Sequence, residues 1–186
     1  MNTTTNKTPR KNMANLMVRE SITEALLRLM KKKDFVNITI SELTKLAGVG
    51  RVSFYRNYET KEDVLKQYMA QISSEWWSKN HSENPTTLWK MTFEIFELLK
   101  PTVLLLRNAH LDSLLYDFIK EGTKLEDAPT TKEGYQRAMF AGIAFGLYNH
   151  WLDNGMKETS EELTAMFQAI SLPYVPYPKT NKKTTN

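Results

Sequence analysis

The sequence predicts an all-α fold, in which a three-helix head with a helix-turn-helix is joined by a long fourth helix to a helical body. Apolar residues recur at helical spacing through most of the chain. Ser, Thr and Asn residues that favour helix N-termini precede several of these segments. No run of alternating β-branched residues between turn signals competes with them, so we expect helices alone.

We expect four segments along the chain of 186 residues. Residues 1–11 lack apolar periodicity and are expected to be a disordered basic tail, and residues 12–66 form the head. Residues 67–173 form the helical body. Residues 174–186 are expected to be a flexible tail, because the end of the chain is rich in proline and then basic.

The first helix is expected over residues 12–33. Its apolar stripe comprises Leu16, Ile22, Leu26 and Leu29. Three lysines, Lys31 to Lys33, crowd its last turn, where positive charge suits the negative end of the helix dipole. Residues 34–38 form a connector to the next helix.

Residues 39–58 predict two short helices separated by a glycine turn. Thr39 and Glu42 form a capping box at the first of them, which is typically worth ~1 kcal/mol. Gly48 stands in the turn, where a positive φ is often needed and glycine has no Cβ penalty. The residues expected to face inward are Leu43, Leu46 and Ala47 on one helix and, partly, Val52, Phe54, Tyr55 and Tyr58 on the other. The residues expected on the outer face of the second helix are Arg51, Ser53, Arg56 and Asn57.

The remaining helices are bounded by caps and prolines. Their expected ranges, caps included, are 60–79, 84–100, 101–122, 130–153 and 159–172. Pro101 is expected to break one helix and to start the next, because proline removes a helical hydrogen bond. Thr130 with Glu133, and Thr159 with Glu162, form capping boxes, and Asn154 with Gly155 ends the long helix between them. Residues 123–129 are expected to be a loop.

The positive charge is concentrated in the head. Residues 1–66 hold 13 Lys and Arg against 7 Asp and Glu, a net of +6, and the other 120 residues hold 12 against 14, a net of −2. A basic head on a slightly acidic body is typical of a nucleic-acid-binding protein, with chance asymmetry of a solvated surface as the alternative. For Lys31 to Lys33 we expect the helix-dipole role, and direct contact with DNA is the alternative.

The sequence offers no constellation for catalysis or metal binding. Cysteine is absent, and His81, His110 and His150 are scattered without metal-ligand spacing. We therefore expect neither an enzyme nor a cofactor. The first twelve residues lack the apolar core of a secretory signal, and the most apolar window, residues 138–152, is too short to cross a bilayer. We expect a cytoplasmic protein.

The second short helix of the head carries side chains that can bind DNA. Arg51 can donate two hydrogen bonds to guanine, and Ser53 and Asn57 can bond base edges or phosphates. Tyr55 can place its hydroxyl on a phosphate, and Lys61 lies at the start of the fourth helix, where a phosphate could be held. The alternative is an ordinary helical hairpin with an exposed polar side.

The stretch LTKLAGVGRVSFYRNYETKEDVL resembles the DNA-binding head of the TetR (tetracycline-repressor-like) family of bacterial transcriptional regulators. The matching positions are Ala47, Gly48, Val49, Phe54, Tyr55, Tyr58 and Lys61, within a likeness that covers residues 12–70. The resemblance implies that Thr39 and Ser41 lie on phosphates, that Arg51, Val52 and Ser53 face bases, and that Tyr55, Asn57 and Lys61 contact the backbone of double-stranded DNA. Gly50 departs from the family, which usually has Ser or Thr there.

The long helix at residues 130–153 predicts a close helix–helix contact. Gly142 and Gly146 form a small-xxx-small face, which permits tight packing either inside the body or across a dimer. The resemblance implies a homodimer with a four-helix interface made of this helix and residues 160–171, and we assign Gly142, Phe145, Gly146 and Trp151 to it. Such a dimer would bind a palindromic site.

Large side chains are frequent in the body. The candidates for a pocket that binds a small apolar or aromatic effector are Trp89, Phe93, Phe96, His110, Phe118 and Phe140. Plain core packing is the alternative for each of them. The sequence thus predicts a homodimeric, ligand-responsive DNA-binding regulator, most often a repressor by family habit. A protein-binding co-activator that keeps the fold without autonomous DNA binding is the alternative.

Overall fold

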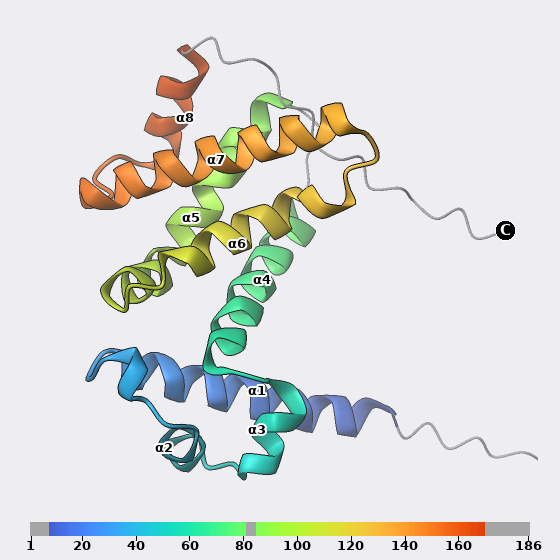
Figure 1. The fold of residues 1–186 in the computed structure, drawn as a ribbon, viewed down its shortest axis with the longest axis vertical. Coiled ribbons are helices and arrows are strands. Elements are labelled where there is room, and N and C mark those ends of the chain that lie inside the picture. The colour runs from blue at the N-terminus through green and yellow to red at the C-terminus, as the bar shows by residue number, and fades with distance from the viewer. Residues whose placement is uncertain (1–7, 81–84, 170–186) are drawn as a thin grey trace, which may run out of the picture. The chain divides into compact units, whose positions relative to one another are not determined.

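The computed structural model describes residues 8–80 and 85–169, and this part of the chain is helical throughout, with no strand (Figure 1). The α-helices are α1 (Thr8–Met30), α2 (Ile40–Leu46), α3 (Arg51–Asn57), α4 (Lys61–Asn80), α5 (Pro85–Asn108), α6 (Asp112–Thr123), α7 (Thr131–Asp153) and α8 (Ser160–Ala169). Two short 3-10 helices are η1 (Phe35–Asn37) and η2 (Leu125–Asp127). The predicted all-α fold is confirmed.

The chain divides into two compact units between Met69 and Ala70, inside α4. We call the described residues up to Met69 the head and those from Ala70 onward the body. The boundary predicted after residue 66 falls in the same helix, one turn earlier.

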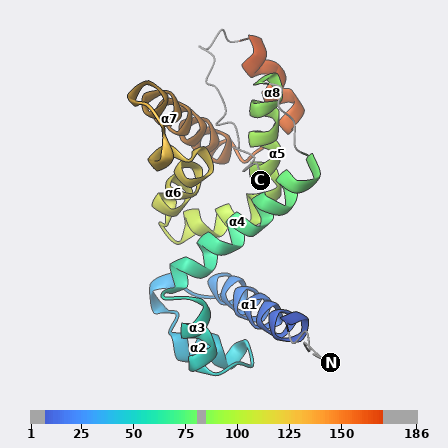
Figure 2. The ribbon, with the colours of Figure 1, turned by 90° about the vertical axis from the view of Figure 1, so that its right-hand side faces the viewer.

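The head is built around a small apolar core to which all of its helices contribute. α2 and α3 pack on one another and on α1 (Figure 2). The fully or nearly fully buried side chains are Ile22, Ala25 and Leu26 of α1, Phe35 and Ile38 of the connector, Leu43 of α2, Phe54 and Tyr58 at α3, and Val64, Leu65 and Met69 of α4. Such a core supplies most of the stability of short helices, which are marginal in isolation.

The limits of α1 differ from those predicted. The helix begins at Thr8 and so includes residues 8–11, which were expected to be disordered. Pro9 does not prevent this, because the N–H that proline lacks has no partner in the first turn of a helix. At the other end α1 stops at Met30, before the three lysines.

Two leucines of the head that were expected in its core are exposed on its surface. Leu16 is 47% exposed and Leu46 is 42% exposed. Among residues 13–30 of α1, no side chain before Ile22 is buried, and the apolar side chains of Met13, Leu16 and Met17 are exposed. In α2, Leu43 alone among the predicted inward residues is buried, because a helix of two turns presents little more than one position to the core.

The body consists of the second half of α4 and helices α5 to α8. α7 packs along α6, and α8 packs against α5, as both ribbon views show (Figures 1 and 2). Its core is aromatic on α5 and α7, where Phe96 stacks on Tyr148 with ring centroids 4.0 Å apart. The Tyr148 hydroxyl donates a hydrogen bond of 3.2 Å to the carbonyl of Phe96, so this buried polar group has a partner.

Pro101 does not break α5, contrary to the prediction. The helix runs from Pro85 to Asn108 with Pro101 inside it. Proline there loses the bond to the carbonyl of Glu97, but its ring lies on the exposed side of the helix. Leu99 and Val103 on either side are buried, so packing of both halves against the body outweighs the local defect.

The break between α5 and α6 lies instead at His110. This residue has φ of 56°, and Leu111 N donates to Leu106 O at 2.9 Å while His110 N donates to Arg107 O at 3.1 Å. This bond pair is a Schellman motif, which glycine usually closes. Histidine adopts the left-handed conformation more often than most residues, but it carries no sequence signal comparable to glycine.

The other predicted helix ends are mostly confirmed. α7 spans Thr131–Asp153, and Thr130 accepts from Glu133 N at 3.2 Å. Thr159 and Glu162 bond reciprocally at 3.1 and 2.8 Å, and Gly155 closes α7 with φ of 77°. The predicted loop at residues 123–129 contains η2. Asn84, Pro173 and the predicted terminal tail 174–186 lie outside the described residues.

Candidate nucleic-acid interface

The turn between α2 and α3 has the geometry that the sequence predicted. Gly48 has φ of 67°, and it lies where an added Cβ would meet no atom but would be strained by the backbone. Val49 N donates to Thr44 O at 3.0 Å, and Gly48 N donates to Lys45 O at 3.3 Å, so the last carbonyls of α2 are satisfied. The buried contact of Leu43 and Phe54 with the core then fixes the pair of helices in the head.

The two helices start from different kinds of cap. Thr39 accepts from Glu42 N at 3.2 Å, which confirms the N-cap of the predicted capping box of α2. Gly50 caps α3 with φ of −78° and ψ of 153° and has no side-chain oxygen to offer. A Cβ at Gly50 would meet no atom within 4 Å, so the backbone there would also accept serine.

The exposed face of α3 is larger than predicted. Phe54 and Tyr58, four residues apart, are the buried pair, with ring centroids 5.8 Å apart. Val52 is 73% exposed and Tyr55 is 54% exposed, so the expectation that they point partly inward is wrong. A seven-residue helix has room for a single inward stripe, and Phe54 and Tyr58 occupy it.

The outward residues of α3 make one surface of mixed chemistry. Arg51, Val52, Tyr55 and Arg56 are all exposed, and we call this set the α3 face. Ser53 and Asn57 are half-buried, and the Asn57 side-chain amide donates to the Ser53 carbonyl at 2.8 Å. Thr39 and Ser41 at the start of α2 are exposed as well. Arg56 and also Lys45 of α2 add exposed positive charge that the predicted set of DNA-binding residues omitted.

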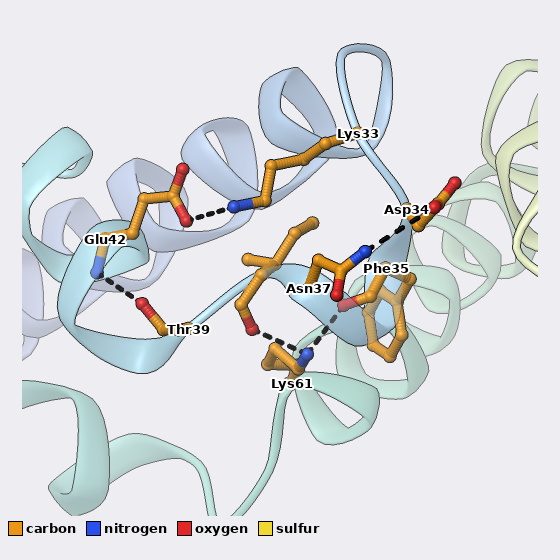
Figure 3. Close-up of polar contacts among 8 residues, drawn as sticks. Lys33, Asp34, Phe35, Asn37, Thr39, Glu42 and Lys61 are labelled. Atoms are coloured by element: carbon orange, nitrogen blue, oxygen red, sulfur yellow. Dashed lines mark hydrogen bonds and ion pairs between the residues drawn. The ribbon is translucent and has the colours of Figure 1, made fainter.

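Lys61 does not extend freely into solvent. Its ammonium donates to the carbonyls of Phe35 and Ile38, both at 2.7 Å, and lies 4.4 Å from the centroid of the Phe35 ring (Figure 3). Burial, together with the nearby positive charge of Lys33, lowers the pKa of Lys61 below its ordinary value of 10.5, and Glu62 opposes this. The phosphate contact predicted for Lys61 stays a prediction, and the structure shows a partner set inside the head.

A second polar contact joins the turn after α1 to α2. Lys33 in this turn pairs with Glu42, which lies in the first turn of α2 (Figure 3). The hydrogen bond from Lys33 lowers the pKa of Glu42 below its ordinary value of 4.5. Lys33 therefore has a partner within the head, in addition to the helix-dipole role predicted for the lysines at positions 31–33.

Arg19 ties α1 to both later helices of the head. Its guanidinium donates to the Gln67 side-chain oxygen at 2.9 Å and approaches the Tyr58 hydroxyl at 3.5 Å. Gln67 in turn donates to the carbonyl of Asn57 at 3.4 Å. These residues lie 39 and 48 positions apart from Arg19 in the chain, so no local pattern could have revealed the network.

The body residues predicted to bind an effector separate into two groups. Trp89, Phe93 and Phe140 share a cluster with Phe167 of α8, in which the Trp89 ring lies 4.6 Å from both Phe140 and Phe167. Phe96 packs on Tyr148. Phe118 is half-buried on α6, whereas His110 is exposed in the turn after α5 and none of the ring contacts described above involves it.

The residues predicted for the dimer interface also separate. Gly142 and Gly146 are exposed, and an added Cβ at either would meet no atom within 4 Å. Packing of this glycine face inside the body, one of the two predicted alternatives, is therefore not observed within the described residues. Phe145 is half-buried against Tyr116. Trp151 is only 3% exposed and donates to the Glu158 carbonyl, so its assignment to a dimer interface is wrong.

Comparison with known proteins starts with the head. A family model described as "Bacterial regulatory proteins, tetR family" matches residues 22–68. Within this segment, the head is similar to the DNA-binding domain of the TetR family. The matched segment contains α2, the turn at Gly48 and α3, so the comparison supports a helix-turn-helix in the head.

One curated relative matches a similarly short part of the chain. The uncharacterized HTH-type transcriptional regulator YxbF of Bacillus subtilis (strain 168) is 33% identical over 58 residues, which are 31% of this chain and 15% of that protein. The match thus spans less than a sixth of the relative's length.

Two solved structures align with the chain over most of its length. Lin0861 from Listeria innocua has a TM-score of 0.70 at 13% identity, covering 84% of this chain and 90% of that one, which shows a shared fold. The fatty acid degradation regulator FadR from Bacillus halodurans has a TM-score of 0.47 at 18% identity, covering 81% of this chain and 92% of that one.

Two searches of the described residues complete the survey. No helix of residues 8–80 and 85–169 is long and apolar enough to span a membrane. In the same ranges, no three His, Cys, Asp or Glu side chains gather as a metal site would require.

Proposed function

We propose that the protein is a homodimeric, ligand-responsive repressor of the TetR family that acts in the cytoplasm and binds a palindromic operator through the α3 face. The observation that carries this proposal is the outward position of Arg51, Val52, Tyr55 and Arg56 on a helix held by a TetR-family turn. A helix presented in this way fits the major groove of DNA.

Each member of the α3 face has a chemical role in this proposal. Arg51 donates two hydrogen bonds to guanine, and the exposed methyl groups of Val52 contact the methyl group of thymine. Tyr55, whose side chain is exposed, and Arg56 bind phosphates. Thr39 and Ser41 at the start of α2 bind phosphates and set the register of the head on the duplex.

The proposed dimer uses the exposed face of α7. Tyr135, Met139, Gly142 and Gly146 lie on this face at intervals of three and four residues, and Met166 is exposed on the neighbouring α8. Apolar side chains beside glycines suit the close approach of a second copy, and a two-fold axis would place two copies of α3 about 34 Å apart.

The proposed effector site is the aromatic cluster of the body. Trp89 is half-buried, and its ring contacts α7 through Phe140 and α8 through Phe167. A flat apolar ligand that replaced one of these ring contacts would change how α5 packs against α7 and α8. Because α7 and α8 also form the proposed dimer face, such a change would alter the spacing of the two heads.

The DNA-binding proposal is tested by selection from a random duplex library, followed by titration of the selected site. The wild-type protein should bind with strong salt dependence, and Arg51→Ala should weaken the selected site by about 1–3 kcal/mol and relax the preference at one base pair. Lys132→Ala, which removes an exposed charge from the body, is the control and should bind as the wild type does. Failure to select any sequence would contradict the proposal.

A protein-binding co-activator is the second candidate, because Gly50 gives α3 no side-chain cap and no hydroxyl for phosphate. This candidate requires a stoichiometric protein partner and no DNA affinity at about 100 mM salt, where specific binders still bind. Gly50→Ser would then restore measurable DNA affinity, whereas it would only strengthen existing affinity under the first proposal.

A further inference from the structure

The contacts of Lys61 join the start of α4 to the connector before α2, so the helix-turn-helix lies between the joined segments in the chain. Lys61 is the first residue of α4, and its ammonium reaches back 26 and 23 positions to the carbonyls of Phe35 and Ile38. Ile38 directly precedes Thr39, the cap of α2. One side chain therefore closes a loop of chain that begins just before α2 and ends just after α3 (Figure 3).

The ammonium has little capacity left for a phosphate. A lysine ammonium has three N–H donors, and two of them are used at 2.7 Å on the connector carbonyls. The face of the Phe35 ring lies 4.4 Å from the same nitrogen, within the range of a cation–π contact. A phosphate contact would have to use the third donor or displace one of these partners.

Both carbonyls belong to residues of the core. Phe35 is 6% exposed and Ile38 is 2% exposed. Removing the ammonium would leave these carbonyl oxygens without a hydrogen-bond donor at positions that water does not readily reach. An unsatisfied buried carbonyl destabilises the folded state. The connector therefore depends on Lys61 for the conformation in which it enters α2.

A second tie acts on the same connector from the other side. Lys33, in the turn after α1, pairs with Glu42 in the first turn of α2. Lys33 thus holds α2 to the turn after α1, and Lys61 holds the residues before α2 to α4 (Figure 3). Together, these two lysines fix the direction of the segment that contains Thr39 and leads to Ser41.

We propose that Lys61 is a positioning residue for DNA binding: it acts by holding the α1–α2 connector and hence the first turn of α2, and not by neutralising a phosphate. This inference rests on the proposed DNA-binding function. It predicts that the effect of removing Lys61 is transmitted through Thr39 and Ser41, whereas the effect of losing a phosphate contact would be purely electrostatic.

The experiment compares Lys61→Met, Lys61→Arg and the control Lys31→Met in the full-length protein. Lys31 is exposed in the turn after α1, so its replacement removes the same charge from the head without touching the connector. Amide hydrogen exchange of residues 35–46 is measured without DNA, and the affinity for the selected operator is measured over a salt series.

For Lys61→Met we expect exchange in residues 35–46 to rise about tenfold and affinity to fall, with the salt slope unchanged. Lys61→Arg, which keeps the charge and has N–H donors for both carbonyls, should restore most of the protection and affinity. Lys31→Met should leave exchange unchanged. Unchanged exchange in Lys61→Met, with a salt slope smaller by about 0.9, would identify a phosphate contact and overturn the proposal.

Two further outcomes are also decided. If Lys61→Met does not fold, Lys61→Gln, which keeps two N–H donors without the charge, is used instead, and the same comparison of exchange and slope applies. If the wild-type protein selects no DNA, the proposed function fails by that result alone. Unchanged hydrogen exchange in the Lys61 variant would then refute, independently of DNA binding, the proposal that Lys61 holds the connector. Increased exchange would support it.

Discussion

Replacing Gly142 or Gly146 with leucine tests whether the exposed glycine face of α7 forms the proposed dimer interface. Within one protomer, neither change meets an obstacle, because a Cβ at either position has no atom within 4 Å. Both residues lie in the interior of a helix of 23 residues, where glycine is less favourable than leucine by about 0.8 kcal/mol. Each substitution should therefore stabilise an isolated protomer slightly.

The same leucine is unfavourable in the proposed dimer. Inserting a large side chain into a packed interface typically costs about 1–3 kcal/mol, and a two-fold axis places the change there twice. The expected loss is thus roughly 2–6 kcal/mol, which weakens the dimer by at least about 30-fold. The opposite signs in protomer and dimer make the result specific to the interface.

Sedimentation velocity over a concentration series measures the dimer dissociation constant. Urea unfolding at low protein concentration measures the free energy of unfolding of the protomer. Gly122→Leu is the matched control, because Gly122 is an exposed helical glycine of α6 whose added Cβ also meets no atom. We expect Gly122→Leu to leave the dissociation constant unchanged, while Gly142→Leu and Gly146→Leu shift the protein to monomer.

The proposed interface is refuted if both α7 variants remain dimeric and their free energies of unfolding rise as much as that of Gly122→Leu. In that case the exposed glycine face is ordinary solvent-facing helix, and the dimer contact must lie elsewhere. A wild-type protein that is monomeric at all accessible concentrations would refute the dimer itself.

Three smaller perturbations test the local geometry. Gly48→Ala should destabilise the protein by about 1–2 kcal/mol in urea unfolding, because alanine is strained at φ of 67°, whereas Gly50→Ser should change stability by only a few tenths; equal effects would contradict the turn geometry. Because Lys33 lowers the pKa of Glu42 below 4.5, the stability that this carboxylate contributes is present above that pH and lost as the pH falls through the lowered value. The stability difference between wild type and Glu42→Gln should therefore vanish in acid, and a pH-independent difference would refute the pairing. Tyr148→Phe should cost about 0.5–1.5 kcal/mol by removing the side-chain hydrogen bond that the Phe96 carbonyl accepts, and an unchanged melting temperature would show that this bond contributes nothing.

Much of the head, and the start of α7 in the body, could be predicted from the sequence because their signals act over four residues or fewer. The cap at Thr39, the turn at Gly48 and the cap at Thr130 each depend on a side chain and a backbone group close together in the chain. The same locality explains why the match to a known DNA-binding head could be seen before any contact was known.

Errors arose where packing decided between local alternatives. Pro101 carries a strong break signal, yet burial of Leu99 and Val103 keeps α5 continuous. His110 carries no comparable signal, yet the chain turns there. On α3, hydrophobicity suggested that Val52 points inward, and the structure leaves it exposed because Phe54 and Tyr58 occupy the inner stripe.

The sequence by itself determined the helical class, the helix-turn-helix and its place at the basic end of the chain, since periodicity, caps and charge are local properties of the chain. The tertiary structure alone decided which side chains remain available for partners. It placed Trp151 inside the body and left Gly142 and Gly146 exposed. It also turned Lys61 toward two carbonyls 26 and 23 residues away. The physical reason is that burial and hydrogen-bond partners depend on segments that are distant in the chain and meet only when it folds.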